Sequence, residues 1–145
     1  MAISVRKIIL WRTEVDNKPG ALADAIQPPA QAGAALKIVM GYRQPKAEGN
    51  AAIEVFPITG RKAAAAAGAA GLKPAPIPAL LVEGDDRQGL GHAIAQAIAG
   101  AGINIAFFMA QVIGRKFAAV IGFETEDDAR KAMPQIRKAG KKARA

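Results

Sequence analysis

Hydrophobic residues along the first half of the chain switch between the short period of strands and the longer period of helices. The expected elements are a strand over 5–15, a helix from Ala21, strands over 36–42 and 51–56, and an alanine-rich helix over 62–70. Leu22 and Ile26 give the first helix one apolar face. Pro28-Pro29 predicts that this helix kinks or ends near Gln27, because each proline removes a backbone donor.

The second half repeats this order of elements. The expected elements are a strand over 80–83, a helix over 90–99, a hairpin of strands over 105–113 and 117–123, and a final helix from Thr125. Between the halves, residues 73–78 hold three prolines and are typical of an extended linker or an edge strand. Pro134 predicts that the final helix is shortened or bent.

Equivalent residues of the two halves lie at one fixed distance along the chain. The pairs are Asp16 and Asp85, Gly20 and Gly89, and Gly33 and Gly102, each 69 positions apart (85−16, 89−20 and 102−33). A fixed offset of this kind indicates a duplicated unit. We therefore expect two domains, residues 1–74 and residues 75–145, the second ending in a basic tail.

Each unit is predicted to follow the order strand, helix, strand, strand, helix, with a weak final strand. This order is typical of the ferredoxin-like α+β fold, βαββαβ, in which both helices cover one face of an antiparallel sheet. The other face or an edge of the sheet is then free to pair with a neighbouring unit. Because small sheets with open edges tend to associate, we also expect a homodimer.

The composition excludes several classes of protein. The chain has 145 residues and no cysteine, which excludes disulfides and thiol catalysis and suits a cytoplasmic protein. The apolar run Ile8–Trp11 is too short for a membrane span or a signal sequence. His92 is the only histidine, so no transition-metal site and no cofactor is expected. The acid pairs Asp85-Asp86 and Asp127-Asp128 are typical of turns and helix starts, so no enzyme is predicted.

The formal charge of +8 leaves a nucleic-acid partner as an alternative. Much of this charge lies in the last helix and tail from Arg130 onward, which holds no acid and is typical of a solvated end. Sheets that bind RNA carry exposed aromatic residues on their middle strands. The expected middle strands carry mainly aliphatic residues instead, among them Ile53, Val55 and Ile121, which disfavours nucleic acid.

The order of elements and two short segments resemble the ACT domain, here in tandem. The segments are Asn17-Lys18-Pro19-Gly20-Ala21-Leu22 and Ala101-Gly102-Ile103-Asn104-Ile105. The resemblance extends from about Ile8 to Ile136 and includes short tandem ACT proteins without a catalytic domain. It implies a regulatory protein that binds a small molecule, usually an amino acid, between units paired side by side. The ligand would lie between the loop after the first strand of one unit and the second strand of its neighbour.

The resemblance also implies which residues hold the ligand. The stronger site would use Asn17, Lys18, Pro19, Gly20, Ala21 and Leu22 from the first unit, with Asn104 and Ile105 from the second. The weaker site would use Asp86, Gln88, Gly89 and Leu90, with Ala35 and Leu36. A helix N-terminus suits a carboxylate, because its first N–H groups are unpaired and carry partial positive charge. The alternative is that Asn17 only caps its turn and Asn104 only satisfies nearby backbone.

Three functions remain open at this point. The first is an amino-acid sensor without catalytic activity, and the second is a regulatory subunit that docks on an amino-acid biosynthetic enzyme. The third is a nucleic-acid-binding protein of ferredoxin-like fold. Fold alone does not separate the first two, since both would use the same architecture.

Overall fold

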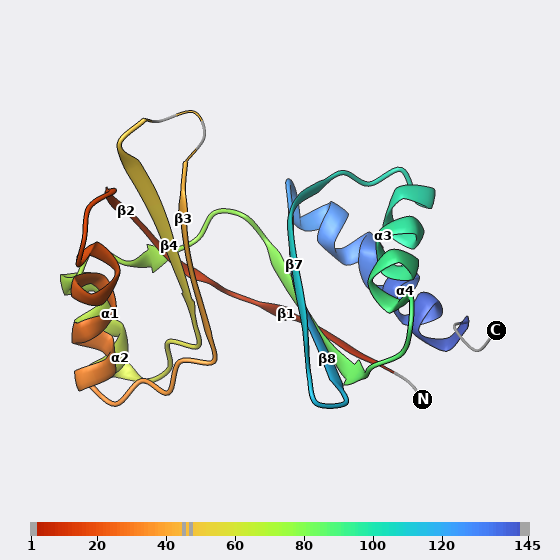
Figure 1. The fold of residues 1–145 in the computed structure, drawn as a ribbon, viewed down its shortest axis with the longest axis horizontal. Coiled ribbons are helices and arrows are strands. Elements are labelled where there is room, and N and C mark those ends of the chain that lie inside the picture. The colour runs from red at the N-terminus through yellow and green to blue at the C-terminus, as the bar shows by residue number, and fades with distance from the viewer. Residues whose placement is uncertain (1–2, 45, 47, 143–145) are drawn as a thin grey trace. The chain divides into compact units, whose positions relative to one another are not determined.

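The computed structural model describes residues 3–44, 46 and 48–142, and the chain forms two compact units (Figure 1). We call residues Ile9–Pro76 the inserted unit. We call the remainder, the N-terminal segment up to Ile8 together with the chain from Ile77, the split unit. No helix within the described residues is long and apolar enough to cross a membrane.

The inserted unit is a four-stranded antiparallel sheet with two helices on one face (Figure 1). Its elements are β2 (Trp11–Asp16), α1 (Ala21–Gln31), β3 (Ile38–Arg43), β4 (Asn50–Phe56), α2 (Arg61–Ala69) and β5 (Lys73–Pro74), in the sheet order β3-β4-β2-β5. Ile53 and Val55 on the central strand β4 pack against Ala25 of α1 and Ala67 of α2. Leu72 closes this core, which is small because α2 consists largely of alanine.

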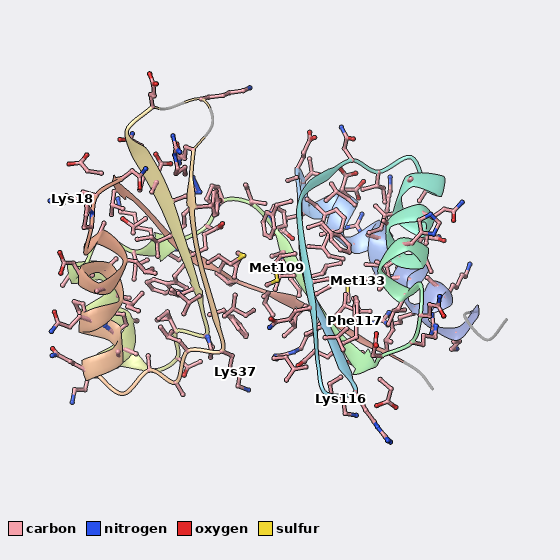
Figure 2. All side chains as sticks on the ribbon, in the orientation of Figure 1. Lys18, Lys37, Met109, Lys116, Phe117 and Met133 are labelled. Atoms are coloured by element: carbon pink, nitrogen blue, oxygen red, sulfur yellow. The ribbon has the colours of Figure 1, made fainter. Side chains whose placement is uncertain are left out.

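The split unit has the same architecture and a larger core. Its elements are β1 (Ser4–Ile8), β6 (Ala79–Asp85), α3 (Leu90–Gly100), β7 (Ile105–Ile113), β8 (Lys116–Phe123) and α4 (Glu126–Lys142), in the sheet order β1-β6-β8-β7. Ile94 and Ile98 of α3 and Ile136 of α4 are fully buried against the sheet. Figure 2 shows Phe117 and Met133 on the side of the sheet that the helices cover.

The predicted fold class is confirmed. Both units are ferredoxin-like, with antiparallel sheets and with helices on one face. The duplicated glycines also occupy equivalent places, since Gly20 precedes α1 and Gly89 precedes α3 with φ angles of 86° and 81°. This left-handed conformation strains any residue with a Cβ, so a glycine recurs at both helix starts.

The expected domain boundaries and the expected strand over 5–15 need correction. That stretch forms two strands in different sheets: Val5 on β1 pairs with Val82, whereas Thr13 on β2 pairs with Ile53. The N-terminal strand therefore belongs with the second half of the chain and not with a domain of residues 1–74. The physical reason is that, within the described residues, no strand follows α4, so β1 occupies the edge position beside β6.

Both helices that contain prolines continue through them, so the expected end of α1 near Gln27 and the shortened last helix are wrong, whereas a kink in α1 and a bend in α4 stay predictions. α1 extends to Gln31 and α4 extends to Lys142, past Pro134. Beyond the prolines of α1, Ala32 N–H donates to the carbonyl of Pro28 at 3.1 Å, so the last turn keeps its hydrogen bonds. Of the basic tail, residues 143–145 lie outside the described residues.

Ile3 anchors the start of β1 because two glycines leave room for its side chain. A Cβ built on Gly84 would lie 2.7 Å from Ile3 Cγ2, and one built on Gly140 would lie 2.5 Å from Ile3 Cγ1. The guanidinium of Arg137 on α4 also donates to the Val5 carbonyl at 3.4 Å. The N-terminal strand is thus held by β6 along its length and by α4 at its start.

We expect Gly84→Ala to destabilise the protein by roughly 1–3 kcal/mol, because the new methyl group overlaps Ile3. At about 4–8 °C per kcal/mol for a domain of this size, calorimetry would detect the change. Gly91→Ala is the matched control, since nothing lies within 4 Å of its Cβ in helix α3. Alanine favours a helix over glycine, so this control should be neutral or slightly stabilising. Equal losses in both variants would contradict the role assigned to Gly84.

Candidate functional site

The loop between β2 and α1 presents an uncapped helix N-terminus. Gly20 is the N-cap residue of α1, and no side chain caps the helix. The Gly20 carbonyl accepts the Asp24 N–H at 2.9 Å, and the loop is held by the Asn17 N–H, which donates to the Gly49 carbonyl at 2.7 Å. The Ala21 N–H donates to the Lys18 carbonyl at 3.2 Å, so the N–H groups between Ala21 and Asp24 and the positive end of the helix dipole are available to an anionic ligand.

A cavity of about 270 Å³ lies between this helix start and the strands β3 and β4. Its lining consists of Val15, Asn17, Lys18, Ala21, Leu22, Gly41, Tyr42, Arg43, Ala51, Ala52 and Ile53. The charged residues of this lining are Lys18 and Arg43, which are both cationic. Figure 2 shows Lys18 where the loop enters α1. The structure thus brings four of the predicted loop residues into one cavity, and adds Arg43, which sequence reasoning missed.

A second cavity, of about 530 Å³, lies at the same helix start. Glu14, Asp16 and Asp24 line it, and it shares Lys18 and Ala21 with the first cavity. The α1 N-terminus is therefore bordered by a cationic cavity and an acidic one. This arrangement offers separate positions for the negative and positive groups of a zwitterion.

Asn104 and Ile105, predicted to complete the stronger site, have contacts within the split unit. The Asn104 amide donates to the Glu124 carboxylate at 3.4 Å, and Ile105 is half-buried against the core of its own unit. These contacts suit the alternative that Asn104 serves its own unit. A joint site with Asn17 stays a prediction.

The loop predicted to form the weaker site is tied to its own unit. Arg87 donates from Nη1 to the Gly140 carbonyl at 2.8 Å and from Nη2 to the Ala139 carbonyl at 2.9 Å. The Asp86 N–H donates to the Arg115 carbonyl at 2.8 Å. Leu90, one of the predicted contact residues, is buried in the core. Arg87 thus binds the end of α4 from the loop that was expected to hold a ligand, and a ligand role for Gln88, Gly89, Ala35 and Leu36 stays a prediction.

Two further polar residues on the sheet of the inserted unit were missed. Glu54 is 1% exposed, and its Oε2 accepts a hydrogen bond of 2.8 Å from the Tyr42 hydroxyl. Burial, followed by this hydrogen bond and the Glu54 charge, raises the pKa of Tyr42 to about 12. A signal was available in the sequence, since Glu54 is a single charge in the otherwise apolar stretch 51–56.

Comparison with known proteins shows a shared fold. No protein-family model and no curated protein matches the chain. Its structure is similar to that of protein BT0572 from Bacteroides thetaiotaomicron, with a TM-score of 0.72, 12% identity, and 90% and 89% of the two chains covered. It is also similar to the ligand-free regulatory subunit of aspartate kinase from Thermus thermophilus, with a TM-score of 0.62, 16% identity, and 96% and 97% covered. At such identities the similarity concerns the fold alone.

The raised pKa of Tyr42 predicts a measurable titration, because the chain has one tyrosine. Ultraviolet absorbance should give a midpoint near 12 in the native protein, against about 10 in the unfolded chain. The native state holds this proton more tightly, so its contribution to stability is complete below pH 10 and is lost as the pH rises through about 12. Glu54→Gln should lower the midpoint, whereas Glu48→Gln, in an exposed turn, should not. An unchanged midpoint in Glu54→Gln would contradict the assignment.

Proposed function

We propose that this chain is a regulatory protein that binds an amino acid at the start of α1 in the inserted unit. The observation that carries the proposal is the uncapped helix start between a cationic and an acidic cavity. The ligand's carboxylate would accept hydrogen bonds from the N–H groups between Ala21 and Asp24 in α1 and pair with both Lys18 and Arg43. Its ammonium group would lie toward Glu14, Asp16 and Asp24.

The loop geometry supports close approach of the ligand to the backbone. Gly20 has no Cβ and adopts a left-handed conformation, so a carboxylate can reach the helix start without a side chain in its way. The resemblance to ACT domains implies that a neighbouring unit completes such a site. Asn104 and Ile105 remain the residues that we expect to do so, with Asn17 and Pro19 on the loop side.

A tandem ACT protein without catalytic activity is the identity that we propose. The similarity of fold to an aspartate kinase regulatory subunit supports a regulatory role. We further propose that the protein acts in the cytoplasm and passes the signal of amino-acid binding to a biosynthetic enzyme on which it docks. Co-purification of such an enzyme with the full chain would test the docking.

We also propose a homodimer formed through the edge strand β7. This nine-residue strand contains no charged residue, and Phe108, Val112 and Ile113 are exposed along it. The Phe123 N–H donates to the Pro78 carbonyl, on the side of β8 that pairs with β6. The backbone N–H and C=O groups of residues an odd number of positions away, Val120 among them, therefore point toward β7 on the other side. Met109 pairs with Val120, so its backbone groups form hydrogen bonds with β8. The next residue, Ala110, therefore directs its N–H away from β8, toward the open edge of the sheet. Such an edge suits antiparallel pairing with a second copy.

An amino-acid panel tests the ligand proposal directly. At a hundred times its dissociation constant, a bound amino acid should stabilise the protein by about 2.7 kcal/mol in a thermal-shift assay. Lys18→Gln and Arg43→Gln should each weaken binding about tenfold or more, because each removes a charge-assisted hydrogen bond. Lys37→Gln should bind normally, since Lys37 lies at the far end of β3 from Lys18 (Figure 2).

The panel can also overturn the proposal. No stabilisation by any of the common amino acids would refute an amino-acid ligand. Normal binding in both Lys18→Gln and Arg43→Gln would place the ligand elsewhere. Asn17→Ala should weaken binding at either kind of site, whereas Asn104→Ala distinguishes the joint site from a site within the inserted unit, because only the joint site requires Asn104.

Ala110→Pro tests the dimer. Proline removes the N–H that faces the open edge and leaves the bonds between β7 and β8 in place, so the variant should be monomeric in sedimentation velocity while keeping its fold. Ala110→Ser keeps the N–H and should remain dimeric. A wild-type protein that sediments as a monomer, or a proline variant that stays dimeric, would exclude this interface.

A further inference from the structure

Four polar side chains gather on the face of the inserted unit's sheet that its helices leave uncovered. Arg12 on β2 stands directly across from Glu54 on β4, so their Cβ atoms are about 4.5–5.5 Å apart. Glu14 is two residues along β2 and shares this face with Arg12. Tyr42 on β3 bonds Glu54 and is influenced by the charges of both Arg12 and Glu14.

Glu54 has one oxygen that is buried without a partner. Its Oε2 accepts from the Tyr42 hydroxyl, whereas Oε1 has no hydrogen-bond partner and no exposure to solvent. Buried carboxylate oxygens in proteins are nearly always hydrogen-bonded, because burial removes them from water. The Oε1 atom of Glu54 is thus an acceptor that a cationic donor would satisfy, and Arg12 is the cation directly opposite on the neighbouring strand.

Arg12 pairs with the other carboxylate in this structure. Its Nη2 lies 3.2 Å from Glu14 Oε2, and the two side chains are 19% and 54% exposed. Pairing with Glu14 keeps the guanidinium near water, whereas pairing with Glu54 would satisfy a buried oxygen at the cost of removing the guanidinium from water. The pair with Glu14 therefore leaves the Glu54 oxygen without a hydrogen bond, whereas the pair with Glu54 carries the cost of desolvating the guanidinium.

Glu14 connects this cluster to the proposed ligand site. It lines the acidic cavity at the start of α1, where the ammonium group of an amino acid would lie. A cation bound there would compete with Arg12 for the Glu14 carboxylate. Arg12 would then lose its partner, whereas Oε1 of Glu54, on the neighbouring strand β4, would still lack a hydrogen bond.

We propose that Arg12 is a two-position switch that pairs with Glu14 when the site is empty and with Glu54 when Glu14 is neutralised. In the second position a continuous network of Tyr42, Glu54 and Arg12 forms on the sheet face opposite to the helices. A change at Glu14 is thereby passed along this face of the sheet to Glu54 and Tyr42. The coupling to a ligand rests on the proposed function, whereas the switch itself is a property of the chain alone.

The switch is tested without any ligand by neutralising Glu14. Glu14→Gln removes the charge that holds Arg12, and Glu14 is exposed enough for the variant to fold. A double-mutant cycle with Arg12→Gln and Glu54→Gln should show little coupling in the wild-type background. In the Glu14→Gln background it should show coupling of about twofold or more in the unfolding equilibrium constant, as for groups in direct contact.

The single tyrosine supplies a second readout. In protein labelled with ¹³C-tyrosine, Glu14→Gln should shift the Tyr42 ring resonance, and it should shift it much less when Arg12 is already glutamine. Asp16→Asn is the matched control, because Asp16 lies on the same face of β2 and lines the same cavity. Since Arg12 is paired with Glu14, that control should leave both the resonance and the coupling unchanged.

Equal coupling between Arg12 and Glu54 in both backgrounds, or none in either, would overturn the switch. These outcomes are independent of the amino-acid panel. A failed panel with positive coupling in Glu14→Gln would refute the proposed function and leave the switch standing. Amino-acid binding without this coupling would support the proposed function and refute the switch.

Discussion

The antiparallel pairing of β1 with β6 supplies the split unit with its fourth strand, and several other features depend on it. The chain must change sheets at Ile9–Leu10, because residues before this point belong to one sheet and those after it to another. Ile3 can reach the end of α4 only because Gly84 and Gly140 lack side chains. The same end of α4 accepts two hydrogen bonds from Arg87, so the start of β1 and the loop before α3 are secured at one place.

Lys18 and Arg87 occupy equivalent positions of the repeat (87−18 = 69), yet they contact different groups. The difference follows from the helices that close the two units. α4 has 17 residues, and its terminal carbonyls reach Arg87, whereas the corresponding α2 has 9 residues and Lys18 lines two cavities instead. The two loops are therefore similar in sequence position, and the greater length of α4 gives the loop of the split unit a contact that the loop of the inserted unit lacks.

The alternation of side chains along β2 divides its residues between the two faces of the inserted unit's sheet. On β2, Val15 lines the cavities at the helix start, whereas Arg12 and Glu14 lie on the other face. Glu14 belongs to both environments, because it also borders the acidic cavity. β5 pairs with β2 at Trp11 and Arg12, so Glu14 lies beyond this pairing, where a ligand and Arg12 can both reach its carboxylate.

The amino-acid sequence was enough to predict most of the elements, the repeated spacing and the glycines at the helix starts, because these depend on local periodicity and backbone conformation. The resemblance to ACT domains pointed to Asn17, Lys18, Ala21 and Leu22, which line one cavity in the structure, and their role in binding stays a prediction. Tertiary structure decided which sheet receives β1, and it brought Arg87 to α4 and Tyr42 to Glu54. The pairings of β1 with β6 and of Arg87 with α4 join residues more than fifty positions apart. The hydrophobic periodicity of the sequence predicts local elements and not such distant pairings. The prolines within α1 and α4 were likewise tolerated because tertiary packing outweighs their local cost.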